Sequence, residues 1–198
     1  MTFDMGTVLR LVLDTIRNPR AGADTILALR LERGVLWQFL ALVIVLSVLA
    51  AQITILMLGG DNGDVLNSPL LGNPLLATGI QAALLLALIY AIYGIGRAFG
   101  GAGAFDDILA LVIWLQFILL IVQMVQTFAL VAFPALGMLI GLASVILFGW
   151  LLVSFVAHVH GFQSLGLVFA GIMVSAFALI FLFSLLLAML GIVVPVSP

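Results

Sequence analysis

Few side chains in this sequence could do chemistry. Ser154 stands four residues before His158, so one face of a helix would carry both side chains. A serine beside a histidine is typical of a hydrolase nucleophile, but the chain has no G-x-S-x-G motif and no evident buried acid to orient the imidazole. We favour a serine that is hydrogen-bonded to its own helix, and we expect no catalytic residue and no enzyme activity.

A metal site is the second chemical possibility. His158 and His160 are two residues apart, so on one helix they point about 200° away from each other. They could share a metal ion, with Asp106 or Asp107, only if the helix had already ended. We expect no metal and no cofactor, and we assign these four residues with Arg97, which could pair with the aspartates, to a candidate cytoplasmic surface.

Neutral polar residues form a third group. Gln116, Gln123 and Thr127 fall within about 40° of one helical face, given 3.6 residues per turn. This candidate polar face could line a path for a small solute, or it could bond to neighbouring helices at about 1 kcal/mol per hydrogen bond. We favour hydrogen bonding between helices.

The composition explains where these groups must lie. Of the 198 residues 66% are hydrophobic and only 7% are charged, whereas a soluble domain is about half apolar and a quarter charged. That balance, with a net charge of −2, excludes a soluble enzyme, a disordered chain and a nucleic-acid-binding protein. The chain is an integral membrane protein, and without cysteine it has no thiolate site.

Five stretches reach the length of about 20 mainly apolar residues that a membrane-spanning helix needs. The predicted fold is therefore an all-α bundle of five transmembrane helices, at about residues 35–58, 75–95, 106–133, 136–159 and 165–193. Pro134 separates the third and fourth spans so closely that a helical hairpin is expected. No ionisable side chain is expected deep in the bilayer, where carriers and pumps usually have one.

Arginine predicts the orientation. All six basic residues are arginines, five before the first span and Arg97 between the second and third. By the positive-inside rule, the amino terminus is cytoplasmic and the carboxyl terminus lies outside. The glycine-rich segment 94–103 lacks the GK[ST] of a phosphate-binding loop and is expected to be a flexible cytoplasmic turn.

The first 33 residues form a cytoplasmic leader ahead of the transmembrane domain at 34–198. Apolar residues from Met5 to Ile16 follow the spacing of one helical face, with Asp4 as a candidate N-cap. Asn18 and Pro19 can end this helix and begin another. The amphipathic helix could lie in the membrane interface or pack on the ends of the spans, and the two arrangements are compatible.

Small residues predict close helix packing. A candidate helix-packing face follows a four-residue spacing along the second span and a GxxxG along the fourth, and it comprises Gly79, Ala83, Ala87, Ala91, Gly137 and Gly141. These faces could pack within the protein or against a partner, and we favour packing within the protein.

The leader with Asn18-Pro19-Arg20, the five spans and the loop from Phe99 to Phe105 resemble the Ypt-interacting-protein (Yip) membrane domain over nearly the whole chain. The compact form is similar to bacterial members, which implies the bacterial inner membrane, with the carboxyl terminus in the periplasm. Eukaryotic members associate with Rab-type GTPases, but their D-L-Y-G-P run is absent, so we expect no Rab-type partner.

We therefore expect a membrane scaffold or accessory protein. It would act in the lipid bilayer by helix–helix and cytoplasmic-surface binding, with other membrane proteins or copies of itself as partners and without nucleic acid. The alternative is a component of a small-solute transporter or channel that uses the polar face of the third span.

Overall fold

The computed structural model describes residues 4–58 and 73–189, and the regular structure in these ranges is helical. Its seven helices are α1 (Met5–Arg17), α2 (Pro19–Leu27), α3 (Arg33–Leu58), α5 (Pro74–Ala98), α6 (Phe105–Ala132), α7 (Pro134–His160) and α8 (Leu165–Met189). The polar segment 59–72 and the predicted end of the fifth span lie outside the described residues.

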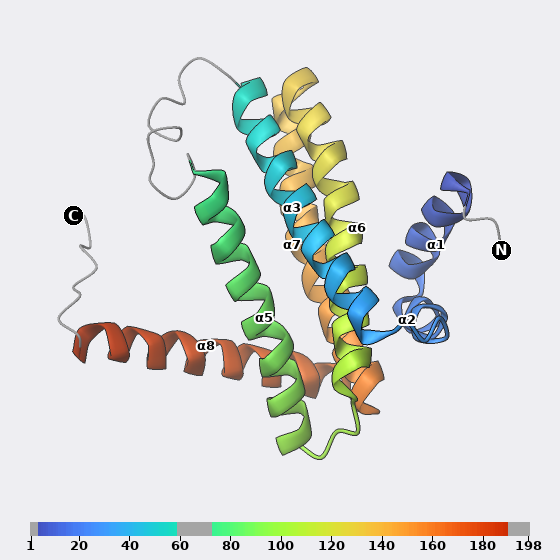
Figure 1. The fold of residues 1–198 in the computed structure, drawn as a ribbon, viewed down its shortest axis with the longest axis vertical. Helices are drawn as coiled ribbons and strands as arrows, with labels where there is room; N and C mark the ends of the chain where they lie inside the picture. Colours follow the sequence, from blue (N-terminus) through green and yellow to red (C-terminus); the bar gives the residue numbers. More distant parts are fainter. Residues whose placement is uncertain (1–3, 59–72, 190–198) are drawn as a thin grey trace.

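Four long helices, α3, α5, α6 and α7, run up and down beside one another and form the bundle (Figure 1). Each has 25 to 28 residues and is apolar enough to cross a membrane. The sequence-based spans agree with these helices to within about one turn at each end. The prediction of a multi-pass, all-α membrane protein is confirmed.

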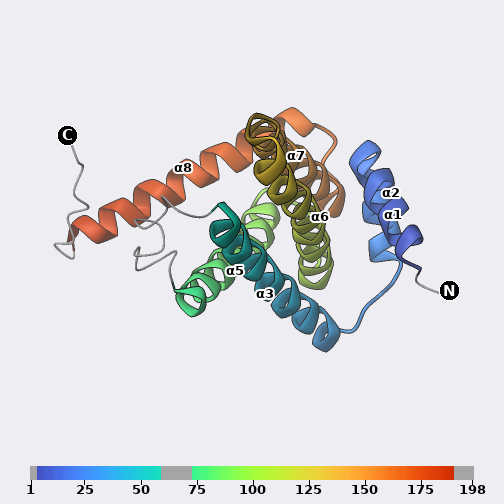
Figure 2. The same ribbon diagram turned by 90° about the horizontal axis from the view of Figure 1, so that it is seen from above.

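The fifth predicted span corresponds to α8, which takes a different course. It packs on α7 and then runs across the direction of the four long helices and away from them (Figures 1 and 2). Among the described residues, Leu165–Ala178 of α8 forms a shorter apolar helix. The structure thus has four long candidate spans and one shorter apolar helix where the sequence predicts five spans. The turn before α8 explains its change of direction, because Gly161 ends α7 with a left-handed φ of 73°.

Helix α6 is the centre of the bundle. It packs against α3, α5, α7 and α2, and Figure 2 shows it between α3 and α7. Leu109, Leu115 and Ile118 of α6 have no exposed side-chain surface. In a membrane this packing is driven by close van der Waals contact and hydrogen bonds, because lipid tails are as apolar as the helices themselves.

Local sequence determines where the helices begin. The Asn18 side chain accepts a hydrogen bond from the backbone N–H of Ala21, and Pro19 occupies the first turn of α2, which confirms that prediction. Asp4 is at the N-cap position of α1, but its side chain makes no capping hydrogen bond. Phe133 alone separates α6 from α7, which Pro134 begins, so the two helices form the expected hairpin.

The leader helices α1 and α2 pack beside α6 and α7 (Figure 1). Val12 of α1 and Ile26 of α2 are buried in the same apolar core as Leu115 of α6. On a neighbouring strip of α1, Leu9 and Leu13 are 45% and 53% exposed. One side of the amphipathic helix therefore packs on the bundle, while an apolar strip beside it stays uncovered.

Candidate functional site

Charged and aromatic side chains gather where α5 ends and α3 and α6 begin. We call this region the arginine end, after Arg33 and Arg97. Arg33 Nε donates to one carboxylate oxygen of Asp106 at 2.7 Å, and its Nη2 donates to the other at 3.1 Å. This bidentate geometry is the most specific arginine–carboxylate pairing, but both side chains are exposed, so the pair stabilises the fold only modestly. Asp106 thus pairs with Arg33 and not with Arg97, which was considered from the sequence as a partner for the aspartates.

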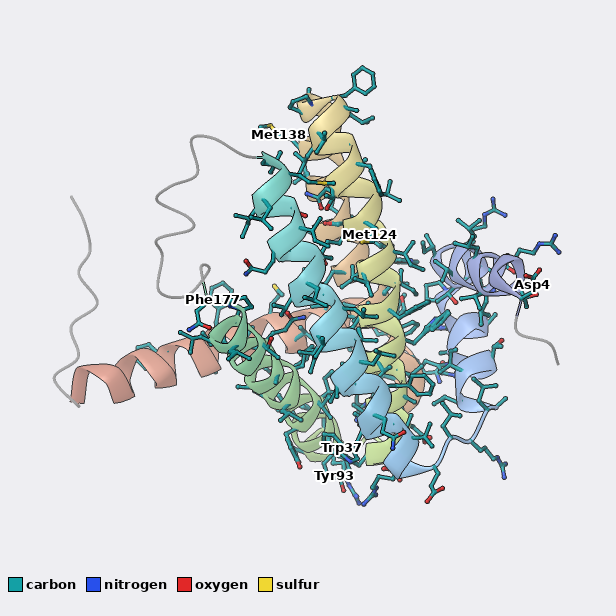
Figure 3. The ribbon with its side chains drawn as sticks, turned by 45° about the horizontal axis from the view of Figure 1, so that its top comes forward. Asp4, Trp37, Tyr93, Met124, Met138 and Phe177 are labelled. Atoms are coloured by element: carbon teal, nitrogen blue, oxygen red, sulfur yellow. The ribbon has the colours of Figure 1, made fainter. Side chains whose placement is uncertain are left out.

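Aromatic rings surround Phe105, the first residue of α6. The ring centroids of three neighbours lie 5.3 to 6.4 Å away, and these neighbours are Trp37, Tyr90 and Tyr93. Figure 3 shows Trp37 and Tyr93 close together at this end. Arg97 donates to the Tyr93 hydroxyl at 2.9 Å, and its guanidinium lies 5.5 Å from the ring centroid of Tyr93. Such arginine–aromatic contacts are typical of the boundary between membrane and water.

His160 is buried, so it does not belong to the candidate cytoplasmic surface. It is 4% exposed, and its ring stacks on Phe162 with 5.4 Å between centroids. Nδ1 lies 3.1 Å from the backbone oxygen of Val156, which requires Nδ1 to carry the hydrogen. Nε2 is buried and has no hydrogen-bond partner among the described residues. Left-handed Gly161 allows the chain to bring Phe162 back over the imidazole.

Three glycines hold the His160 ring. A Cβ atom at Gly96 or at Gly101 would overlap the imidazole, and one at Gly103 would lie 3.0 Å from Nε2. The backbone N–H of Ala102 also donates to the His160 carbonyl oxygen at 3.4 Å. The segment expected to be a flexible turn is therefore packed closely on the end of α7. We call this arrangement of Gly96, Gly101 and Gly103 around His160 the glycine cradle.

Two polar contacts hold the leader on the bundle. His158 Nε2 lies 2.9 Å from Asp24 Oδ1 of α2. Trp114 Nε1 of α6 donates to the hydroxyl oxygen of Thr15, which is fully buried. His158 therefore contacts the leader. Asp107, another residue of the candidate cytoplasmic surface, lies in the first turn of α6. It is half-buried and has no hydrogen-bond partner among the described residues.

The polar face of α6 is turned partly toward α3. Gln123 Nε2 donates to the backbone oxygen of Ser47 at 3.3 Å, and the hydroxyls of Thr127 and Thr54 lie 2.6 Å apart. Gln116, two turns earlier, is half-buried and has no hydrogen-bond partner among the described residues. The structure thus places Gln123 and Thr127 in a contact between helices and leaves Gln116 outside it.

The small residues of α7 face α6. Gly137 is buried, and a Cβ atom there would lie 2.5 Å from Leu130 Cγ and 2.7 Å from Leu130 Cα. A Cβ atom at Gly141 would lie 2.7 Å from the amide nitrogen of Gln126. This half of the candidate helix-packing face therefore lies inside the α6–α7 hairpin.

The small residues of α5 are placed differently. Gly79, Ala83 and Ala87 are exposed, Ala91 is half-buried, and a Cβ atom at Gly79 would have no atom within 4 Å. Packing within the protein, which we favoured from the sequence, does not describe these three exposed residues. The reason is that α5 turns Leu85 and Ile89 toward the core and the small residues away from it.

In the described part of the chain, the serine–histidine pair and the histidine–aspartate metal site considered from the sequence are not assembled. The Ser154 hydroxyl donates to the backbone oxygen of Trp150 at 2.7 Å, one turn back on its own helix, and His158 is turned toward Asp24. Within residues 4–58 and 73–189, no three His, Asp or Glu residues come together as a metal site would need.

Sequence reasoning missed two features of this end. It did not find Arg33 as the partner of Asp106, because a long-range pairing has no local pattern. It also missed the cradle, although several glycines close together before a helix can indicate a close approach of backbone to a side chain. Only the contact with His160 shows which side chain comes close.

The family model of the Yip1 domain matches residues 13–187, which cover most of the chain. No curated protein and no solved structure matches it.

Proposed function

Because the chain belongs to the Yip1 domain family, we propose that it is a membrane scaffold or accessory protein that acts by binding and not by catalysis. Its partners would be other membrane proteins or further copies of the chain. Binding would use the exposed helix faces and the arginine end.

One observation carries this proposal: polar side chains of the bundle interior hold its own helices together. Gln123 and Thr127 bond to α3, and Thr15 bonds to Trp114. These groups are engaged by neighbouring helices and do not line a polar path. By contrast, the charged side chain of Arg97 is exposed and can contact a partner. The side of α5 that carries Ala83 is exposed as well.

We further propose that the protein lies in the bacterial inner membrane with its arginine end in the cytoplasm. Four arginines precede α3, Arg33 begins it and Arg97 lies in the last turn of α5, which favours this orientation. The carboxyl terminus would be periplasmic if α8, which has 25 residues but runs across the direction of the four long helices, crosses the bilayer as a fifth span. Leu9 and Leu13 of α1 would then contact the membrane interface.

Cysteine labelling tests the orientation, because the chain has no cysteine of its own. Single variants Asp61→Cys and Ser197→Cys, both outside the described residues, should react with an impermeant thiol reagent in intact cells. Ala102→Cys, which is exposed in the α5–α6 loop, should react only after the cells are opened. Labelling at position 102 in intact cells would contradict the orientation. Protection of position 197 alone would show that α8 does not cross the membrane.

A small-solute transporter or channel component is the second candidate. The observation in its favour is Gln116, which is half-buried and makes no hydrogen bond to the other described residues. A path for a solute along α6 would have to include the Gln116 side chain, because Gln123 is hydrogen-bonded to α3.

Two double variants separate the candidates. Gln116→Leu with Gln123→Leu should remove the hydrogen bond from Gln123 to Ser47, weaken the fold by about 1 kcal/mol and leave binding intact. Arg97→Ala with Asp107→Ala should reduce recovery of co-purifying proteins from native membranes in mild detergent. Both variants are also tested for rescue of a deletion strain. If the glutamine variant assembles normally yet fails to rescue, transport replaces binding as the better explanation.

A further inference from the structure

An open groove of about 550 Å³ lies where α8 diverges from the bundle. Its three walls are formed by α5, α7 and the first half of α8, through residues that include Leu88, Ala91, Ile95, Leu152, Gly171 and Ser175. The volume falls in the range of about 300–1,000 Å³ that is usual for ligand sites. Figure 1 shows that α8 crosses the direction of α5.

Small residues make the groove deep. Ala91 of α5 faces it from one side, and Gly171 and Ser175 of α8 face it from the other. A Cβ atom at Gly171 would meet no other atom within 4 Å. The large side chains of Val174 and Phe177 on α8 do not line the groove and are about 70% exposed.

The lining changes from apolar to polar along the groove. Along α5 and α7 the lining side chains are apolar, whereas Gln163 and Ser164 lie at the turn before α8, beside Phe99 of the glycine-rich loop. The Ser164 hydroxyl oxygen accepts from the backbone N–H of Leu167 at 3.3 Å, which leaves its hydrogen to donate. The exposed amide of Gln163 donates one hydrogen to the Gly161 carbonyl oxygen at 3.5 Å, and its second N–H hydrogen makes it another donor at this end.

We propose that this groove binds one acyl chain of a phospholipid, with the ester and phosphate oxygens of the lipid at Gln163 and Ser164. Two of its walls, α5 and α7, are long and apolar enough to span a membrane, and the third is the apolar first part of α8, so the groove borders hydrocarbon. An acyl chain brings no backbone polar groups that would need partners there. The polar end next to an apolar body matches an amphiphile, whereas a second membrane helix would meet the donors of Gln163 and Ser164 with an apolar surface.

Photocrosslinking in bilayer discs tests the proposal on the natural chain. The probe is a phosphatidylcholine with a diazirine in the middle of one acyl chain, and the adducts are located by mass spectrometry. Leu152 is the diagnostic position, because it lines the groove but is only 6% exposed. We expect adducts at Leu152 and Leu88 above the level at Leu142 of α7, which is 63% exposed outside the groove. Adducts that simply follow exposure, with none at Leu152, would mean ordinary surrounding lipid and would overturn the proposal.

A filled-groove variant provides the matched comparison. Gly171→Phe should lower the yield of adducts at Leu152 several-fold while leaving the yield at Leu142 unchanged. Val174→Phe, on the same helix outside the groove, should change neither. Unchanged labelling of Leu152 in a Gly171→Phe protein with normal helix content would contradict a specific site.

Occupation by protein is tested separately with cysteines at Ala91 and Gly171. A disulfide requires Cα atoms within about 7 Å, so efficient bridging within one chain would show that α8 closes on α5 and leaves no room for lipid. Efficient bridging between chains would show that a second copy fills the groove. Either result overturns the proposal, and we expect neither bridge to form in a bilayer.

Discussion

Gly137→Ala should destabilise the α6–α7 hairpin by about 1–3 kcal/mol, the usual effect of overfilling a packed interior. The added methyl group would lie 2.5 Å from Leu130 Cγ and 2.7 Å from Leu130 Cα. A side chain could rotate away, but the contact with a backbone atom forces α6 and α7 apart. Since α6 is the centre of the bundle, the loss should extend to its contacts with α3.

The measurement is unfolding of the purified protein in mixed micelles by sodium dodecyl sulfate, followed by tryptophan fluorescence. Gly149→Ala is the matched control, because it makes the same change on the same helix where a Cβ atom meets nothing within 4 Å. Equal loss of stability in both variants would show that glycine at position 137 is not needed for close packing.

Gly96→Ala should be similarly damaging, through the glycine cradle. Its methyl group would overlap the His160 imidazole, which is held in place by Val156 and Phe162. We expect a loss of about 1–3 kcal/mol in the free energy of unfolding. Gly94→Ala, two residues earlier in α5 and in open space, should instead be neutral or stabilise the helix by up to about 1 kcal/mol.

A double variant distinguishes a steric clash from a general need for glycine. His160→Ala removes the ring that the new methyl group would strike, so Gly96→Ala with His160→Ala should lose less stability than the sum of the single variants. The coupling is read from the same unfolding curves. Additive losses would mean that Gly96 is required for backbone reasons and that the cradle does not depend on His160.

The sequence predicted the helices well because their ends have local causes. Asn18 and Pro19 start α2, and Pro134 starts α7, and each acts within a few residues of its own position. The hydrophobic length of each span is equally local. Nothing about these features depends on a distant part of the chain.

The packing partners were harder to predict because the long helices are apolar on every side. In a soluble helix, an apolar stripe shows which face is inward, as it does for α1. On α5 the exposed Ala83 and the buried Leu85 both look like interior residues. The course of α8 was missed for the same reason. The pairing of Arg33 with Asp106 and the burial of His160 likewise depend on how separate helices rotate against each other.

The single residue between α6 and α7 has a consequence for biosynthesis. A hairpin that enters the bilayer as one unit must carry its turn through the hydrocarbon, and each charged residue there would add about 2.5–3.5 kcal/mol. Here the turn consists of Phe133 and Pro134, with Ala132 and Ala135 beside them, and none of the four is charged. We therefore expect both helices to enter the bilayer together, so that α7 does not wait as a lone span with Gly137 and Gly141 exposed to lipid.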